Sequence, residues 1–258
     1  MKTLKTLKHS IGRNTYAKRA TVLAMTLATM APTVKAQDKV EATLGADLVS
    51  QYYWRGQDLG NISLQPTLGL SWKGLSLSAW GNVGISKWED TKEFDLTLAY
   101  AIKGFHVGVT DYFFASADGS TKYFNYKAHQ TAHLYEGNIG YDFGPVALIW
   151  YTNFAGNDYR LKDDGTSKRA YSSYVEATVP FRLAKLDWEA ALGAVPYAPA
   201  QSVYANVDGF AVTNVSVKAT KSFDAGKHLD IPVFAQIAAN PASQKAYFVV
   251  GVSLQPKF

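Results

Sequence analysis

The sequence of 258 residues contains no cysteine. This absence excludes a disulfide framework, thiol catalysis and a lipid-modified cysteine behind an export signal. The chain also has no run of 18 apolar residues, which argues against a membrane-spanning helix. A secreted chain of this length without disulfides needs a large core or a closed sheet, and we expect a single domain.

Acidic residues are absent from residues 1–36, which hold 7 of the 26 Lys and Arg. A short apolar stretch covers residues 20–34, and Val34-Lys35-Ala36 fits the small-x-small pattern of a cleavage site. The alternative, a membrane anchor, needs about 20 apolar residues. We therefore expect a secretory signal peptide over residues 1–36 and a mature domain over residues 37–258.

Positive charge is not in excess in the mature domain. It carries 19 of the Lys and Arg and all 21 Asp and Glu, a net charge of −2. The alkaline pI of about 9.1 thus belongs to the targeting segment. No basic surface suggests nucleic acid as a partner.

Apolar and polar residues alternate along most of the mature domain. In residues 61–73, for example, Ile62, Leu64 and Leu68 share one face while Gln65 and Thr67 share the other. A period of two predicts strands whose two faces meet different surroundings. Twelve such runs are predicted, at residues 39–55, 61–73, 75–87, 93–103, 105–115, 130–143, 145–155, 169–181, 185–197, 209–222, 228–239 and 245–258.

The connections between these runs alternate in length. Lys73-Gly74, Lys103-Gly104 and Gly144-Pro145 are tight, whereas residues 115–129, 156–168 and 198–208 form long loops. Short turns at one end and long loops at the other are typical of transmembrane barrels, with the short turns periplasmic. The sequence predicts an all-β fold, a single antiparallel transmembrane β-barrel of about twelve strands.

The last run ends on Phe258, in phase with the apolar face of its strand. It resembles the C-terminal signal by which Gram-negative outer-membrane barrels engage their assembly machinery. We therefore expect the bacterial outer membrane as the location, with its lipid and the assembly machinery, through Phe258, as partners. An outward ring of aromatic residues near the short turns fits a headgroup boundary: Trp72, Tyr100, Phe105, Phe143, Phe181, Trp188, Phe223 and Phe258.

Two stretches carry a family resemblance. Residues 48–56, Leu-Val-Ser-Gln-Tyr-Tyr-Trp-Arg-Gly, precede Gln65-Pro66 and a Ser-rich strand with Trp80. This opening resembles that of the TorF porin family, and residues 232–236 with Asn240-Pro241 resemble uncharacterised barrels of the same group. Tyr53, which follows Tyr52, lengthens the family's spacing slightly. The resemblance implies an outer-membrane barrel more firmly than it implies a transported solute.

If the apolar face meets lipid, the other face lines the lumen. Strand parity places seven charged candidates there: Asp47, Arg55, Glu136, Glu176, Asp187, Glu189 and Lys218. A turn centred on Arg182-Leu183 would set Glu176 opposite Glu189, and opposed carboxylates need a cation or a proton. Two interpretations stay open: a structural salt-bridge network, or a cation-biased constriction with Arg55 or Lys218 on the opposite wall.

Catalytic groups are scarce. An outer-membrane lipid hydrolase needs a nucleophile beside a general base, usually Ser and His. His106 and His133 are the histidines on predicted strands, and neither has a serine of matching phase nearby. The five histidines show no ligand spacing. We therefore expect no enzyme, no metal and no cofactor.

The sequence thus favours a narrow passive channel for small hydrophilic solutes. Twelve strands leave a lumen between the filled eight-stranded and the open sixteen-stranded barrels. One alternative is a closed, non-conducting barrel with a structural role or with interactions through loops 115–129 and 156–168. Residues 122–127, for instance, mix bases and aromatics that suit a glycan or lipid headgroup. A lipid-modifying enzyme is a weaker alternative.

Overall fold

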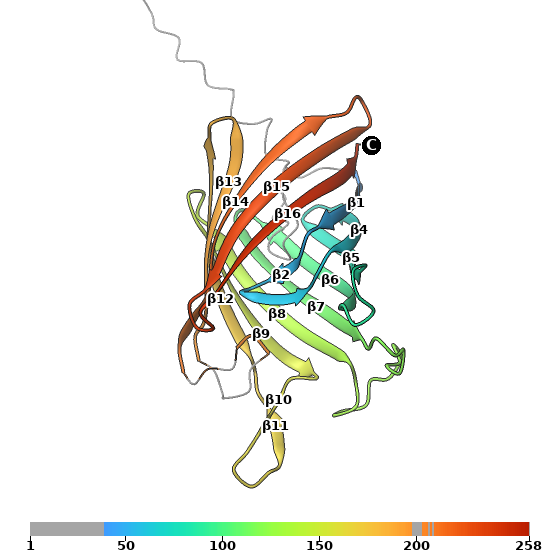
Figure 1. The fold of residues 1–258 in the computed structure, drawn as a ribbon, viewed down its shortest axis with the longest axis vertical. Helices are drawn as coiled ribbons and strands as arrows, with labels where there is room; N and C mark the ends of the chain where they lie inside the picture. Colours follow the sequence, from blue (N-terminus) through green and yellow to red (C-terminus); the bar gives the residue numbers. More distant parts are fainter. Residues whose placement is uncertain (1–38, 198–202, 206, 208, 258) are drawn as a thin grey trace, which may run out of the picture.

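In the computed structural model, residues 39–197, 203–205, 207 and 209–257 are described. The predicted signal peptide and Phe258 lie outside these residues. The described chain forms a closed antiparallel barrel of twelve strands, which confirms the predicted fold (Figure 1). Its first half comprises β1 (Glu41–Val49), β4 (Ser63–Trp72), β5 (Leu75–Gly84), β6 (Lys92–Ile102), β7 (Phe105–Ala115) and β8 (His133–Asp142). Its second half comprises β9 (Ala147–Gly156), β12 (Ser173–Leu183), β13 (Leu186–Val195), β14 (Ala211–Asp224), β15 (Leu229–Asn240) and β16 (Lys245–Pro256).

The barrel closes where the first strand pairs with the last. Residues 46–49 of β1 lie opposite residues 251–254 of β16, and every other wall strand pairs with its neighbour in sequence order. Tight turns such as Lys73-Gly74, where both residues have positive φ, join strands at one end, called here the short-turn end. The other end is called the long-loop end. Among the described residues, no helix is long and apolar enough to cross a membrane.

Two small hairpins stand outside the barrel wall. β10 (Tyr159–Leu161) and β11 (Ser167–Arg169) project beyond the long-loop end (Figure 1). β2 (Tyr52–Trp54) and β3 (Gln57–Gly60) instead run across the barrel, in front of β7 and β8 in this view. The predicted strand 39–55 is therefore wrong beyond Val49. The reason is that Tyr52, Tyr53 and Trp54 are all buried, so this segment has no face for an apolar exterior.

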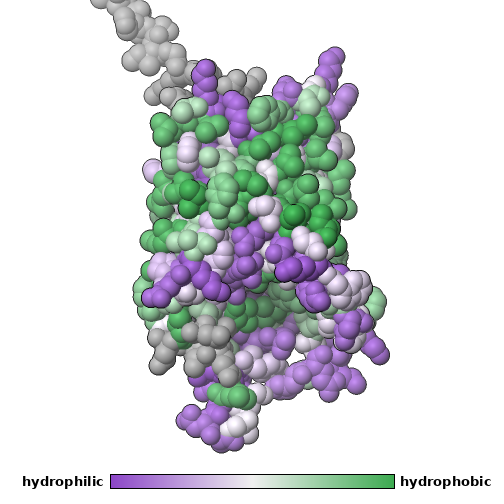
Figure 2. All heavy atoms as spheres, in the orientation of Figure 1, coloured by the Kyte–Doolittle hydropathy of each residue, from purple (hydrophilic) through white to green (hydrophobic). Residues whose placement is uncertain are grey.

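The strands carry their apolar side chains outward. Leu64, Leu68 and Leu98 are about half exposed, whereas Gln65 and Thr67 are buried. The predicted alternation is thus present, with polar side chains inside and apolar side chains outside. In Figure 2 the visible face has a broad hydrophobic band with hydrophilic residues towards both ends. An apolar surface of this extent needs an apolar surrounding.

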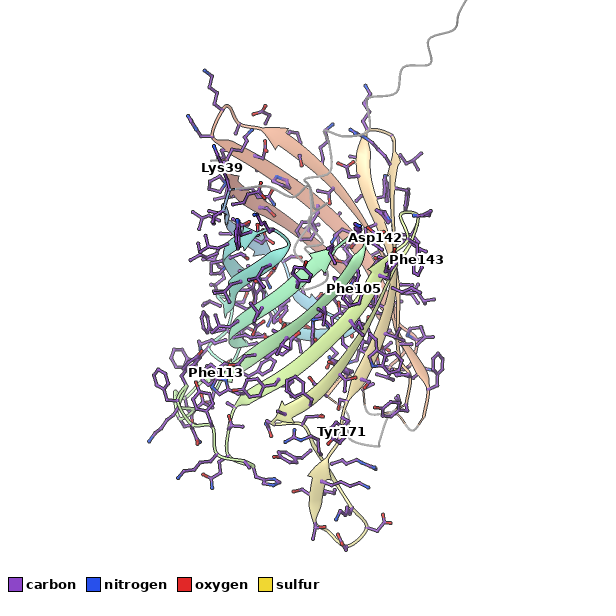
Figure 3. All side chains as sticks on the ribbon, turned by 180° about the vertical axis from the view of Figure 1, so that it is seen from behind. Lys39, Phe105, Phe113, Asp142, Phe143 and Tyr171 are labelled. Atoms are coloured by element: carbon purple, nitrogen blue, oxygen red, sulfur yellow. The ribbon has the colours of Figure 1, made fainter. Side chains whose placement is uncertain are left out.

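Aromatic side chains mark the edges of this band. Trp72, Phe143 and Phe223, three of the predicted aromatic ring, are about half exposed beside short turns. In Figure 3 Phe143 lies directly after β8, and Phe113 lies lower in the view, near the end of β7. Side chains with an apolar body suit the boundary between an apolar layer and water.

Candidate functional site

The seven lumen candidates lie at two levels of the barrel. Asp47, Glu136, Glu176, Asp187, Glu189 and Lys218 stand on wall strands, and Arg55 stands at the tip of the β2–β3 hairpin. The fold brings together Arg55 with Glu136, and Lys218 with Glu189 at 3.3 Å. It does not bring Glu176 to Glu189.

The predicted pairing of Glu176 with Glu189 is wrong by four residues. Glu176 lies opposite Gly193, and Glu189 lies opposite Pro180. The turn is formed by Ala184 and Lys185, both with positive φ, rather than by Arg182-Leu183. Because the shift is an even number, the residues keep their face while they change their partners. The same turn would also have set Thr178 opposite Asp187, whereas Thr178 lies opposite Ala191 and Asp187 pairs with Arg182 at 3.7 Å.

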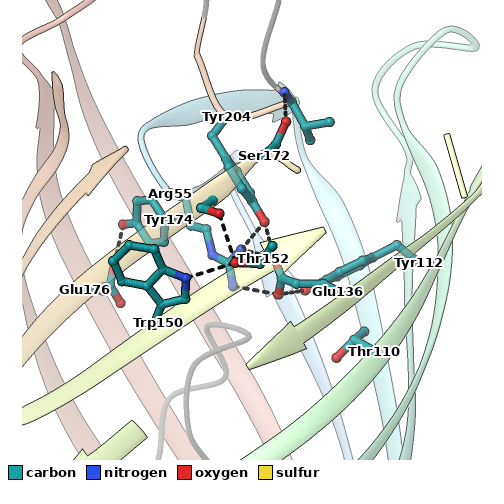
Figure 4. A network of polar contacts seen from close by, with 12 residues as sticks. Arg55, Thr110, Tyr112, Glu136, Trp150, Thr152, Ser172, Tyr174, Glu176 and Tyr204 are labelled. Carbon is teal, nitrogen blue, oxygen red and sulfur yellow. Dashed lines mark hydrogen bonds and ion pairs between the residues drawn. The ribbon is translucent and has the colours of Figure 1, made fainter. Parts of the chain in front are cut away.

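Arg55 and Glu136 form a buried ion pair in the lumen (Figure 4). Nη1 of Arg55 donates to Oε2 of Glu136 at 2.5 Å, and Nη2 donates to Oε1 at 3.1 Å. Arg55 occupies the hairpin turn with a φ of 49°, and Gly56 follows with a φ of 88°. The turn thereby directs the guanidinium towards β8, which carries Glu136. A bidentate pair of this kind fixes both position and orientation.

Two tyrosines complete the bonding of the Glu136 carboxylate. The Tyr112 hydroxyl on β7 donates to Oε1 at 2.9 Å, and the Tyr204 hydroxyl donates to Oε2. Tyr204 comes from the segment between β13 and β14. Burial, together with the neighbouring carboxylate, raises the pKa of the Tyr204 phenol, so it remains a donor. Glu136 therefore ties the hairpin, the barrel wall and a second long-loop segment together.

Aromatic rings surround the guanidinium of Arg55. Its Cζ lies 3.7 Å from the ring centroid of Tyr151 and 4.5 Å from that of Trp54. The rings of Tyr174 and Tyr204 are at 5.0 and 5.3 Å. Cation–π attraction is strongest where water is excluded, as it is here. The arrangement holds a positive charge without solvent.

The remainder of the hairpin is hydrogen-bonded to opposite walls of the barrel. Tyr52 donates to Glu93 of β6 at 2.8 Å, and Tyr53 donates to Asn214 of β14 at 2.8 Å. Asn240 of β15 donates to the carbonyl of Gly56 at 2.9 Å. These contacts span the cross-section of the barrel, so the hairpin forms a constriction close to the long-loop end. Residues 52–60 are called the plug hairpin below.

The two halves of the lumen differ in solvent access. At the plug hairpin, the side chain of Glu136 is 1% exposed. Towards the short-turn end, the side chains of Glu189 and Asp187 are 34% and 46% exposed. The side chains of Glu189 and Asp187 are therefore more accessible to water than the ion pair at the plug hairpin.

Sequence reasoning missed most partners of Arg55. Tyr112, Tyr151 and Tyr204 were not predicted, although Tyr112 and Tyr151 share the phase of the inner face. Tyr204 lies on a loop, where alternation gives no signal. The described residues contain no cluster of three or more His, Asp or Glu arranged to hold a metal ion.

The known proteins that are similar to this chain share little of its sequence. No family and no curated protein matches the sequence, so the resemblance to the TorF family stays a prediction. Among solved structures, the NanC porin has 11% identity and a TM-score of 0.45, covering 84% of this chain and 100% of that one. An outer-membrane channel from Pseudomonas putida F1 has 15% identity and a TM-score of 0.43, covering 88% and 99%. OmpF of Salmonella typhi, in complex with daunomycin, has 9% identity and a TM-score of 0.34, covering 84% and 97%.

Proposed function

We propose that the protein is an outer-membrane β-barrel that acts as a narrow passive channel for small hydrophilic solutes. The observation that carries the proposal is the inversion of polarity on a closed sheet. Apolar side chains such as Leu68 and Leu98 stand outside, while polar ones such as Gln65 and Ser253 are inside. In lipid only a closed barrel satisfies all backbone groups of a sheet. A polar inner face then holds water.

The inner face favours cations. Acidic side chains outnumber basic ones along it, and the bases Arg55, Lys218 and Arg182 are each paired with a carboxylate. Small solutes and ions passing the plug hairpin would meet this negative field at close range. The preferred cargo is therefore neutral or positively charged.

A closed barrel is the second candidate, and one observation favours it. The plug hairpin and the rings around Arg55 leave Tyr112, Glu136 and Tyr174 almost without solvent contact. A barrel that stays in this state conducts nothing and serves a structural or surface role. Conduction requires the plug hairpin to leave a narrow path or to shift.

Planar bilayers containing the barrel without residues 1–36 separate the two candidates. The channel predicts reproducible unitary current steps with a cation-biased reversal potential. Replacing Arg55 with Ala should enlarge the steps several-fold, because it releases the plug hairpin from Glu136. Silence of both proteins at every salt concentration would reject the channel in favour of the closed barrel.

We further propose that the assembly machinery of the outer membrane engages the final strand through Phe258. Deletion of Phe258 should slow insertion into vesicles that contain this machinery and leave spontaneous insertion into plain lipid vesicles unchanged. Equal rates with and without Phe258 in both systems would reject the role. Retention of residues 1–36 by the exported protein would similarly reject the cleavage site after Ala36.

A further inference from the structure

Two buried carboxylates lie side by side on the inner face of the barrel, next to the plug hairpin. Glu93 and Asp95 stand two residues apart on β6, on its inner face, and are 6% and 1% exposed. Side chains two residues apart on a strand leave the same face, so the two carboxyl groups are neighbours. Two negative charges at this separation and burial repel strongly, so the pair needs a proton or a cation beside it.

No basic side chain of the described residues supplies that cation. The ion pairs of the lumen join Arg55 to Glu136, Lys218 to Glu189 and Arg182 to Asp187, so these bases are already paired. Glu93 receives one hydrogen bond, from the Tyr52 hydroxyl. Neither carboxylate oxygen of Asp95 receives one from a donor group. A buried carboxylate that receives no hydrogen bond has a large desolvation cost. A positively charged ligand beside it would offset that cost.

Aromatic residues flank the two carboxylates on the neighbouring strands and on the plug hairpin. Asp95 lies between Trp80 on β5 and Tyr112 on β7 in the strand register, and Glu93 lies beside Phe114. The ring of Tyr52, on the plug hairpin, is 5.6 Å from that of Trp80, and the rings of Tyr112 and Phe114 are stacked at 6.4 Å. Trp80 and Phe114 are only partly buried, so the collar keeps some contact with solvent.

This chemistry distinguishes between kinds of cation. A divalent metal ion prefers six or more oxygen ligands or a cluster of ligating side chains, and the described residues offer no such cluster. An organic ammonium ion instead needs carboxylates as acceptors for its N–H groups and aromatic faces against its alkyl part. Glu93, Asp95 and the collar of Tyr52, Trp80, Tyr112 and Phe114 provide both.

We infer that Glu93 and Asp95, with their aromatic collar, form a binding site for a small alkylammonium ion. The inference rests on the proposed channel and names the class of solute that the constriction selects. It also explains why Tyr52 of the plug hairpin is bonded to Glu93, because the hairpin then forms one wall of the site. An alkylammonium solute entering the site competes with Tyr52 for Glu93 and moves through the constriction along the acidic wall.

Single-channel recording in KCl with added ethylammonium chloride tests the site. Ethylammonium should interrupt the potassium current in a concentration-dependent manner. Asp95→Asn should raise the concentration for half-block about tenfold or more, because it removes the acceptor that has no other donor. Trp80→Leu should raise that concentration about fivefold, because it removes one aromatic face. Asp230→Asn is the matched control, since Asp230 lies on β15 and is already paired with Lys257.

The outcomes separate this inference from the proposed function. Unitary currents whose block by ethylammonium is the same in the native protein, Asp95→Asn and Glu93→Gln would overturn the site and leave the channel intact. If the barrel is silent, the channel fails, and thermal unfolding of the folded barrel decides the site. A rise in Tm with ethylammonium that Asp95→Asn or Glu93→Gln abolishes supports the site. A Tm that responds to pH alone would overturn it, because a shared proton would then neutralise the pair.

Discussion

The plug hairpin and the loop of residues 116–132 are both held by a buried contact to β8, but on opposite faces of the barrel. The hairpin reaches Glu136 from inside through Arg55. The loop folds over the outer face, where the ring of Tyr123 packs on Phe94 and Phe113. Beneath it, Nδ1 of His133 lies 2.7 Å from Oδ1 of Asp111, and Nε2 lies 2.6 Å from the carbonyl oxygen of Tyr123.

Strand parity explains the difference between these two segments. His133 and Glu136 are three residues apart on β8, so their side chains leave opposite faces. The ring of His133 lies between a carboxylate oxygen of Asp111 and the carbonyl oxygen of Tyr123. One strand therefore anchors one segment within the lumen and another outside it. The contact of Arg55 with Glu136 is called here the inner anchor, and the contacts of His133 are called the outer anchor. Changes at the inner anchor should alter conduction, and changes at the outer anchor should not.

The largest effect is expected at the inner anchor. Arg55→Ala leaves Glu136 charged and buried without its partner, and breaking a buried pair costs about 3–5 kcal/mol. We expect this loss in the free energy of unfolding of the folded barrel, measured in detergent by denaturant titration, together with a several-fold larger unitary conductance. The matched control is Arg182→Ala, whose pair with Asp187 is about half exposed and is worth about 1 kcal/mol or less. Equal losses in the two variants would contradict the role of burial.

The turn of the plug hairpin should give the second largest effect. A Cβ atom on Gly56 would lie 1.8 Å from the carbonyl oxygen of Thr213, and the φ of Gly56 is +88°. Gly56→Ala must therefore move the hairpin, and the strain should lower the free energy of unfolding by about 1–3 kcal/mol. The variant should also raise the unitary conductance, as Arg55→Ala does. Gly119→Ala serves as control, because Gly119 has a φ of +71° with open space around it. A variant Gly56→Ala with native conductance would show that the hairpin does not limit the current.

The outer anchor should give a smaller effect of a different kind. His133→Ala removes the ring that contacts Asp111 and the carbonyl oxygen of Tyr123. Because Asp111 then has no partner, the free energy of unfolding should fall by about 1–3 kcal/mol. Hydrogen exchange should become faster in residues 116–132, and unitary conductance should stay at the native value. If conductance rose as much as in Arg55→Ala, the separation of the two faces would be wrong.

The same comparison shows how far the sequence predicts the molecule. The twelve wall strands follow from alternation, because side chains such as Leu68 and Gln65 meet different surroundings on the two faces. The plug hairpin escapes this rule because Tyr52 and Tyr53 are buried whichever way they point. The register between β12 and β13 depends on a turn at Ala184-Lys185, where no glycine or proline marks the position. Local turn geometry, rather than hydropathy, therefore decided which charges of the lumen meet.

The candidate site was predicted only in part, because alternation shows which residues face the lumen but not which of them are in contact. Arg55 and Glu136 were placed in the lumen from polarity, but their contact joins residues 81 positions apart through a hairpin that alternation does not predict. Glu93 and Asp95 share the inner phase of β6 and were not singled out, because the sequence does not show that they lack a basic partner. Which charges pair depends on how the strands are arranged in the closed barrel. The pairs are therefore known only once the neighbours of every inner side chain are known.

The smallest effect is expected in the outer loop itself, at a turn distant from both anchors. Hydrogen bonds from the side chain of Ser116 and the backbone of Ser120 lower the pKa of Asp118 to about 2. A lowered pKa means that these bonds stabilise the turn fully above the ordinary aspartate value of about 4, and that the contribution is lost as the pH falls through about 2. Amide signals of residues 116–121 should therefore keep their native positions from pH 7 to about pH 4 and shift below it. Asp118→Asn, which carries no charge, should lack this transition, while His133 and conductance remain native. A midpoint near 4 in the native protein would mean that the serines do not hold the carboxylate, and that the loop is fastened by the His133 anchor alone.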